Sequence, residues 1–214
     1  SKNELESIKH HFINHISIND NYSVGKYEKE GLALINNLFI KHKILFLCGG
    51  SGLYIDAICE GLNKFPIIKK ETREKTRHDL VTKGLNYLNK ELKEIDIEKY
   101  NKIDKKNSRR VTRAIEVCRS SNRPYSYYLD KKKEERKFNI LYIGLNDERK
   151  KIYERINTRA NQMIENGLID EAKELYTYKD YQALQTIGYR EVFKYIDRKL
   201  SNTELINAIQ QNTR

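Results

Sequence analysis

The residues best suited to chemistry form a short glycine cluster with one hydroxyl, Gly49-Gly50-Ser51-Gly52. Glycines in such a loop let backbone N–H groups approach an anion closely, and a helix that begins there adds a partial positive charge. The loop is not a nucleotide P-loop, because the GxxxxGK[ST] pattern and its lysine are absent. The alternative is a tight turn whose glycines only let neighbouring elements pack closely. The loop taken alone leaves both interpretations open.

Three arginines within five positions, Arg109, Arg110 and Arg113, form the second candidate site. Guanidinium groups stay charged and present fixed donor pairs that suit phosphate oxygens. At helical spacing, Arg109, Arg113 and Glu116 line up on the outside of a helix. The inward positions are Val111, Ala114, Ile115 and Cys118. A helix whose arginines pair with Glu116 and its neighbours is the alternative, and it is less favoured because few acids lie nearby.

Positive charge is concentrated around these arginines. The formal net charge is +11, and the segment 99–137 holds fourteen Lys or Arg against five Asp or Glu. Such a block is typical of a surface that binds a polyanion, and nucleic acid is favoured over a merely solvated face. Tyr125, Tyr127 and Tyr128 lie between this helix and the run Lys131-Lys132-Lys133. Aromatic rings among basic residues suit stacking on unpaired bases, although tyrosines can equally serve packing.

Two apolar runs predict the elements that position the glycine loop. Ile44–Cys48 and Phe138–Leu145 are uninterrupted apolar runs, the pattern of parallel strands that are buried on both faces. Leu53, Ala57 and Ile58 then recur at helical spacing after the loop, which would lie at the carboxyl end of its strand. The predicted fold class is therefore α/β, with a parallel sheet core.

Several helices without an intervening strand follow the loop and predict an inserted helical subdomain. Apolar spacing predicts helices over 71–83 and from Leu85 to Ile95, with Gly84 between them and Asp96 capping a third. Ser23 is a plausible N-cap of an earlier helix, and Ser201 with Glu204 forms a capping box near the end. We predict three parts: residues 1–70 in the core, 71–137 as the helical insertion, and 138–214 returning to the core.

Other classes of protein are disfavoured. Three widely spaced cysteines without a CxxC pair argue against a disulfide framework or a zinc site. His11 and His15 could share one helical face, but Ile13, Ile16 and Ile18 alternate with polar residues there, and no metal ligands are assigned. No apolar run reaches membrane-spanning length. We expect a cytoplasmic monomer that does not bind membranes. Because the only methionine is Met163, we also expect residue 1 not to be a native start.

Five motifs occur in a specific order along the whole chain: GGSGLY at 49–54, RRVTRAIEV at 109–117, GLIDE at 167–171, IGYRE at 187–191 and QNTR at 211–214. Together with His10-His11, Tyr22-Ser23-Val24 and the Asn-Arg-Pro turn at 122–124, this set resembles the tRNA dimethylallyltransferase family, also called tRNA isopentenyltransferases. The family prenylates adenosine 37 beside the anticodon.

The resemblance implies a P-loop-kinase-like α/β core with a helical insertion that grips the anticodon stem-loop of tRNA. It implies transfer of a dimethylallyl group from dimethylallyl diphosphate to N6 of the adenine, with Mg²⁺ as the cofactor. Ser51 matches a catalytic hydroxyl that is usually Thr in the family, and Gly49, Gly50 and Gly52 surround it. The positions that match tRNA or substrate contacts are Arg73, Arg109, Arg110, Val111, Thr112, Arg113, Gly188, Tyr189 and Arg190.

The sequence also departs from the family pattern. The opening P-loop, the Asp that acts as general base, the Mg²⁺ ligands and the basic segment after the terminal Thr-Arg do not occur in these residues. We therefore expect the full-length parent to be the enzyme and these 214 residues alone to be inactive. Two alternatives stay open. One is a nucleotide or small-molecule kinase that shares the core, and the other is a non-catalytic tRNA-binding module.

Overall fold

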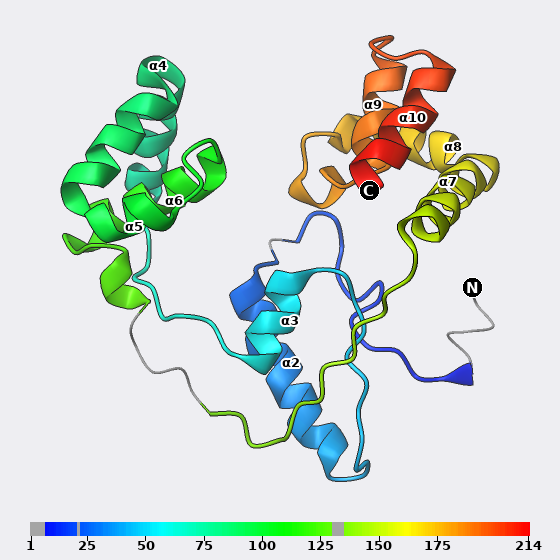
Figure 1. The fold of residues 1–214 in the computed structure, drawn as a ribbon, viewed down its shortest axis with the longest axis horizontal. Coiled ribbons are helices and arrows are strands. Elements are labelled where there is room, and N and C mark those ends of the chain that lie inside the picture. Colours follow the sequence, from blue (N-terminus) through cyan, green and yellow to red (C-terminus); the bar gives the residue numbers. More distant parts are fainter. Residues whose placement is uncertain (1–6, 21, 130–134) are drawn as a thin grey trace. The chain divides into compact units, whose positions relative to one another are not determined.

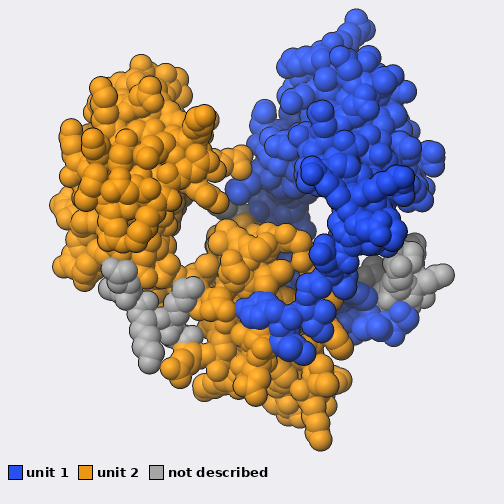
Figure 2. All heavy atoms as spheres, viewed as in Figure 1, with its two compact units in different colours: residues 1–21, 141–214 blue, residues 22–140 orange. Residues whose placement is uncertain are grey.

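The computed structural model describes residues 7–20, 22–129 and 135–214, and consists of helices joined by irregular segments (Figure 1). Its contacts divide the chain into two compact units. Unit 2 covers residues 22–140, and unit 1 combines residues 1–21 with 141–214 (Figure 2). The three-part division drawn from the sequence stays a prediction. Within the described residues, no helix is long and apolar enough to cross a lipid bilayer.

The predicted parallel sheet is wrong, because the described part of the chain contains no β-strand. The two apolar runs, Ile44–Cys48 and Phe138–Leu145, have no regular secondary structure. Their side chains are mostly exposed, with Phe46 at 86% and Leu145 at 98%. A strand forms only where a neighbour pairs with its backbone N–H and C=O groups. An apolar run shows a tendency to be buried, but the described residues provide neither run with a partner strand.

In unit 2, helix α2 (Val24–Phe39) packs against helix α3 (Gly52–Cys59). The predicted N-cap of α2 is confirmed, since the Ser23 side chain accepts a hydrogen bond from the Lys26 amide at 3.2 Å. Gly31 is buried where the two helices meet. A Cβ atom there would lie 2.6 Å from Cδ1 of Ile58, so a larger residue would force the Ile58 side chain to shift.

The helical part of unit 2 contains α4 (Lys70–Ile95), α5 (Ile97–Lys102), α6 (Ser108–Ser121) and the 3₁₀ turn η1 (Ser126–Tyr128). Gly84 interrupts α4 with φ 80° and ψ 170°, as its position in the sequence predicted. The Asp96 and Asn107 side chains cap α5 and α6. The buried core between α4 and α6 consists of Leu88, Leu92, Ile103, Val111, Ala114, Ile115 and Cys118.

A largely buried arginine joins α6 to α4. Arg119, whose side chain is 16% exposed, donates from Nε and Nη2 to the Glu91 carboxylate at 2.7 and 2.6 Å. Its Nη2 lies 2.9 Å from Asp79 Oδ2, and its Nη1 donates to the Thr76 hydroxyl at 3.1 Å. A hydrogen bond from Lys83, together with Arg119, lowers the pKa of Asp79. The guanidinium therefore pairs with the buried Asp79, which it shares with Lys83, and with the partly buried Glu91.

Unit 1 is built from α7 (Arg149–Glu165), α8 (Leu168–Glu174), α9 (Tyr189–Ile196) and α10 (Asn202–Thr213). The 3₁₀ turns η2 (Tyr176–Tyr178) and η3 (Gln182–Leu184) lie between α8 and α9. The predicted capping box of α10 is confirmed by the reciprocal bonds of Ser201 and Glu204. The core contains Ala160, Leu168, Ala172, Leu184, Val192, Phe193, Leu205 and Ile209.

Replacing Arg119 with alanine should destabilise unit 2 by about 3–5 kcal/mol, because the partly buried Glu91 would lose its cation and the buried Asp79 would keep only Lys83. Arg123→Ala is the matched control, since Arg123 is exposed and its guanidinium only stacks on the Tyr127 ring at 4.5 Å. The control should cost about 1 kcal/mol or less. Urea unfolding followed by circular dichroism measures both changes. Equal losses of stability would contradict the assigned role of Arg119.

Candidate substrate and nucleic-acid sites

Ser51 lies at the N-cap of α3, and its hydroxyl makes no hydrogen bond with the residues that the structure describes. The residue is exposed, its backbone is extended, and its side chain makes no capping hydrogen bond. Gly49, Gly50 and Gly52 also lie open, since a Cβ atom on any of them would meet nothing within 4 Å among the described residues. None has the left-handed backbone that requires glycine. Packing within the described structure therefore does not explain these glycines, which favours the ligand-binding interpretation of the loop.

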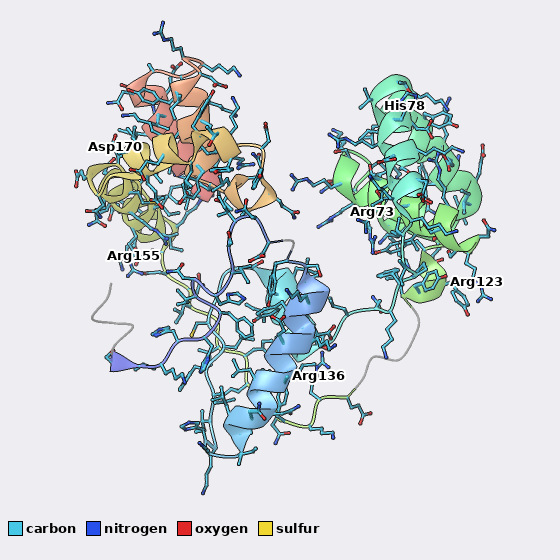
Figure 3. All side chains as sticks on the ribbon, turned by 180° about the vertical axis from the view of Figure 1, so that it is seen from behind. Arg73, His78, Arg123, Arg136, Arg155 and Asp170 are labelled. Atoms are coloured by element: carbon cyan, nitrogen blue, oxygen red, sulfur yellow. The ribbon has the colours of Figure 1, made fainter. Side chains whose placement is uncertain are left out.

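Arg136 fixes the opposite end of α3 (Figure 3). It donates from Nε to the Ile58 carbonyl and from Nη2 to the Ala57 carbonyl, both at 2.7 Å. The same Nη2 donates to Glu28 Oε1 of α2 at 2.7 Å, and only 9% of the side chain is exposed. A cation at a helix C-terminus satisfies free carbonyls and complements the helix dipole. Arg136 thereby fixes α3 against α2, and Ser51 directly precedes the first residue of α3.

The sequence did not identify Arg136 as a positioning residue. It counted only as one charge of the basic block, because Glu28 lies 108 positions away in the chain. Its fixed position also removes it from the charges that are free to meet a polyanion.

The RRVTR segment divides into exposed and buried members. Arg109 and Arg110 are exposed, and no hydrogen bond or ion pair engages either guanidinium within the described structure. Arg113 lies 3.9 Å from Glu116 and 5.7 Å from the centroid of the Phe65 ring, with its side chain 44% exposed. Val111 is fully buried in the core. The arginines can therefore contact a polyanion, whereas Val111 holds α6 in place.

Thr112 does not present its hydroxyl to solvent. Its Oγ1 atom is buried without a hydrogen-bond partner in the part of the chain that the structure describes. Lys99 is a further cation near Arg110, and its ammonium lies 4.5 Å from the Tyr125 ring centroid. Burial, with the nearby charges of Arg110 and Lys102, lowers the pKa of Lys99. Burial is the larger cause of this lowering, and the two neighbouring cations add to it.

Arg73 and the tyrosines lie in the same unit but differ in exposure. Arg73 is exposed on α4 (Figure 3). Tyr128 is buried beside Ile68 and Val117, so it serves packing rather than stacking. Tyr127 is 43% exposed and is the more available ring for a base. The run Lys131-Lys132-Lys133 lies outside the described residues.

Three of the sequence motifs meet in unit 1. Glu191 of IGYRE is buried and accepts a hydrogen bond from the Gly188 amide at 2.7 Å. It also accepts one from Asn212 of QNTR at 2.8 Å. The Tyr189 hydroxyl donates to Glu171 of GLIDE at 2.7 Å, and burial together with this bond raises the pKa of Tyr189 to about 12. The three motifs thus form one hydrogen-bonded network.

This network gives Gly188 and Tyr189 structural roles that the sequence did not show. Gly188 has φ 101°, and a Cβ atom would lie 3.3 Å from Cε of Met163, so the position requires glycine. Arg190 is exposed, with its guanidinium 3.7 Å from Glu191. Of the three predicted contacts, Arg190 is the one whose side chain is available to RNA, and contact by all three stays a prediction.

Neither a metal site nor the general base can be assigned to the described residues. They contain no group of three or more His, Cys, Asp or Glu side chains that could hold an ion. They therefore do not by themselves form the Mg²⁺ site that the resemblance implies. What they offer is an open glycine loop with a free hydroxyl in unit 2, and exposed guanidinium groups in both units.

Comparison with known proteins identifies the family. A family model described as IPP transferase matches residues 1–214. This chain belongs to the IPP transferase family. A protein named tRNA dimethylallyltransferase from Christiangramia forsetii is 46% identical over 213 residues, which cover 100% of this chain and 70% of that protein. The protein of the same name from Flavobacterium psychrophilum is 43% identical, covering 100% of this chain and 72% of its own length.

Solved structures agree with this assignment. The full-length tRNA isopentenylpyrophosphate transferase of Bacillus halodurans matches with a TM-score of 0.63 at 31% identity, covering 99% of this chain and 67% of that one. A eukaryotic dimethylallyltransferase described as acting on tRNA has a TM-score of 0.76 at 23% identity, covering 99% and 55%. The second likeness shows the fold alone. The family resemblance inferred from the ordered motifs is confirmed.

Two glycines test the distinction between structural and ligand-facing positions. Gly188→Ala should cost about 1–3 kcal/mol of stability, because it places a side chain in a left-handed conformation. Gly49→Ala is the matched control and should change stability by about 0.5 kcal/mol or less, since its Cβ enters open space. Denaturant unfolding of both variants measures the difference. A loss of stability in Gly49→Ala as large as that in Gly188→Ala would show that the loop glycines serve packing.

Proposed function

We propose that this chain supplies the tRNA grip and part of the substrate site of an enzyme that transfers a dimethylallyl group from dimethylallyl diphosphate to tRNA. Its acceptor is N6 of adenosine 37 in the anticodon stem-loop. The observation that carries the proposal is the match of the whole chain to the IPP transferase family, whose relatives are named tRNA dimethylallyltransferases. The open loop at Ser51 and the exposed arginines of α6 support it.

The chemistry explains what the loop would contribute. In the transfer, the adenine N6 forms a bond to the first carbon of the dimethylallyl group while that carbon's bond to the diphosphate oxygen breaks. The diphosphate leaves with the bonding electrons, and a general base accepts the N6 proton. The Ser51 hydroxyl is free to hydrogen-bond a group at the reaction centre, and the open glycines let backbone N–H groups approach developing negative charge. Mg²⁺ stays a prediction.

The tRNA grip is assigned to the helical part of unit 2. Arg109, Arg110 and Arg113 extend from α6, whose inward face is fixed in the α4–α6 core. Guanidinium groups on a rigid helix suit phosphate oxygens, which position the RNA without reading its sequence. Tyr127 is exposed enough to stack on a splayed base. A monomeric state and a cytoplasmic location also belong to the proposal.

Of the two alternatives, the comparisons do not support the kinase, because the matching proteins are named as transferases that act on tRNA. The non-catalytic module is also disfavoured, since the relatives that cover the whole chain are named as enzymes. That these 214 residues alone are inactive stays a prediction.

Removing the α6 charges should weaken RNA binding. The triple variant Arg109→Ala, Arg110→Ala and Arg113→Ala should lose about 1–3 kcal/mol of binding free energy per direct contact. The dependence of affinity on salt should also become shallower. Filter binding to an anticodon stem-loop at two salt concentrations measures both effects. Lys29→Ala, Lys41→Ala and Lys43→Ala together remove equal charge from exposed positions of the same unit. If both triple variants weakened RNA binding equally, the loss of net charge would explain the effect, and the assignment of α6 would be wrong.

Ser51 is tested in the full-length enzyme. Ser51→Ala should lower the prenylation rate far more than it lowers tRNA affinity, because the hydroxyl is lost at the reaction centre. Ser51→Thr keeps the hydroxyl and should stay close to the unchanged enzyme. Steady-state incorporation of labelled dimethylallyl into tRNA compares the three proteins. If alanine were harmless and threonine damaging, the position would serve packing only.

A further inference from the structure

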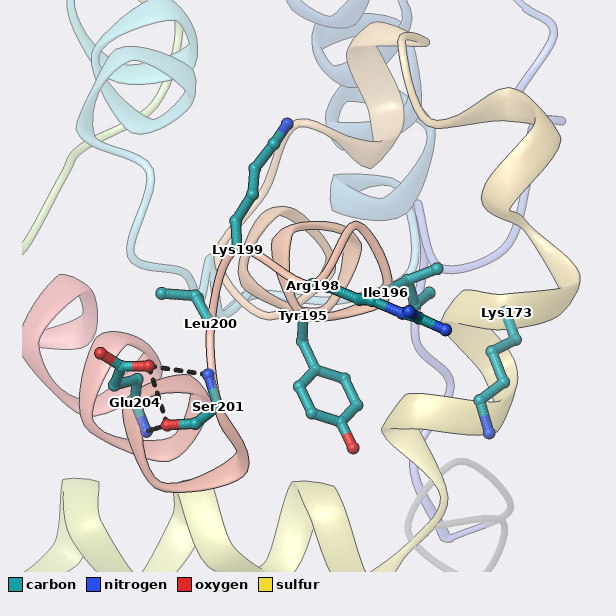
Figure 4. A pocket seen from close by; sticks show the side chains of 8 residues that line it. All are labelled: Lys173, Tyr195, Ile196, Arg198, Lys199, Leu200, Ser201 and Glu204. Atoms are coloured by element: carbon teal, nitrogen blue, oxygen red, sulfur yellow. Dashed lines mark hydrogen bonds between the residues drawn. The ribbon is translucent and has the colours of Figure 1, made fainter.

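A second basic site occurs in unit 1, on a surface that no predicted contact includes. A pocket of about 650 Å³ lies between the end of α9, the start of α10 and one face of α8 (Figure 4). Three of its lining side chains are cations, Lys173, Arg198 and Lys199, and the only acid among them is Glu204. We call it the α9–α10 pocket. Lys199 pairs with Asp197 at 3.0 Å. Arg198 and Lys173 are therefore the cations that face the pocket and suit an anion (Figure 4).

Arg198 has a backbone conformation that disfavours arginine. It lies just beyond the C-cap Asp197 with φ 58°, in the left-handed region. The Lys199 amide donates to the Lys194 carbonyl, and the Arg198 amide donates to the Tyr195 carbonyl, both at 2.9 Å. These are the two hydrogen bonds that commonly end a helix, and the left-handed residue between them is usually glycine. A side chain at this position destabilises the fold without improving the turn.

The Arg198 side chain does not compensate for this strain. Its guanidinium makes no hydrogen bond or ion pair with the described residues. Figure 4 shows Arg198 extending toward Lys173, with the Tyr195 ring projecting beside them, while Lys199 points away. Strained backbone that the fold does not need is characteristic of functional positions. Contacts within unit 1 therefore give no reason for arginine here, whereas an anion in the pocket would.

The other charged residues of the pocket leave room for such an anion. Lys173 pairs with Asp170 at 2.8 Å, but both side chains are well exposed, and exposed pairs contribute little and exchange readily. Glu204 is engaged in the α10 capping box, where its Oε2 accepts from the Ser201 amide at 2.7 Å and from the Ser201 hydroxyl at 2.8 Å. Arg198, Lys173 and the Tyr195 hydroxyl are thus the donors available to a ligand.

We propose that the α9–α10 pocket binds a backbone phosphate of tRNA, with Arg198 as the principal contact; this rests on the proposed function. The pocket is open to solvent rather than enclosed, which suits a polymer lying across it better than a small anion held on all sides. The guanidinium fork suits phosphate oxygens, and Tyr195 and Lys173 can donate to the same group. The contact would position tRNA without reading its sequence.

Arg198→Gly tests the proposal with opposite effects on stability and binding. Relief of the left-handed strain should raise the unfolding midpoint by about 2–4 °C. Loss of the phosphate contact should weaken tRNA binding about tenfold and make its salt dependence shallower. Arg198→Lys keeps the charge but loses the fork, so its affinity should be intermediate. Arg155→Ala is the charge control, because Arg155 already pairs with Asp147 at 3.0 Å, and it should bind tRNA nearly as the unchanged chain does.

The outcomes separate this proposal from the proposed function. If the unchanged chain binds tRNA and Arg198→Gly binds equally well, the pocket assignment fails and the proposed function stands. Equal weakening by Arg155→Ala also overturns the assignment, because net charge would then explain the effect. If inorganic phosphate binding, followed by NMR, is lost in Arg198→Gly while tRNA binding is kept, the pocket is a small-anion site and the RNA assignment is wrong. No tRNA binding by the unchanged chain would overturn both proposals.

Discussion

The orientation of α6 in the helical part of unit 2 depends on one largely buried guanidinium, that of Arg119 between Glu91 and Asp79. Both carboxylates contact the Arg119 guanidinium. Rotation of α6 about its axis would therefore break the ion pairs of Arg119. At about 100° per residue, Arg110 lies nine positions earlier and therefore on the opposite side of α6. The ion pairs of Arg119 anchor one face of α6, and the face that carries Arg110 is therefore exposed. The apolar core beneath α6 allows this helix orientation, and the ionic network specifies it.

The sequence predicted most of what is local. Ser23 and Asp96 cap helices as predicted, because each cap needs only a side-chain oxygen and an amide three residues away. The sheet could not be predicted in the same way. The run Ile44–Cys48 has the composition of a buried strand, but a strand is defined by its neighbour, and composition does not reveal whether a neighbour is present. The prediction was wrong where structure depends on distant pairing.

The same limit applies to the sites. The glycine loop and the α6 arginines could be identified because their chemistry lies within a few consecutive residues. The link from Arg136 to Glu28 and the link from Glu191 to Asn212 were missed because these partners lie 108 and 21 positions apart in the sequence. The IGYRE and QNTR motifs therefore contain residues that contact each other within unit 1, in addition to any residues that contact RNA.

At some positions of this chain the fold explains the residue type, and at others it does not. The fold favours glycine at Gly31, where a Cβ atom would displace Ile58, and at Gly188, where φ is 101°. Gly49, Gly50 and Gly52 have open space and ordinary backbone angles, and Arg198 adopts a conformation better suited to glycine. The first set is explained by packing and the second is not. Strained or unsupported positions of this kind are typical of functional sites, and the second set is therefore where the proposals for the loop and for Arg198 are made.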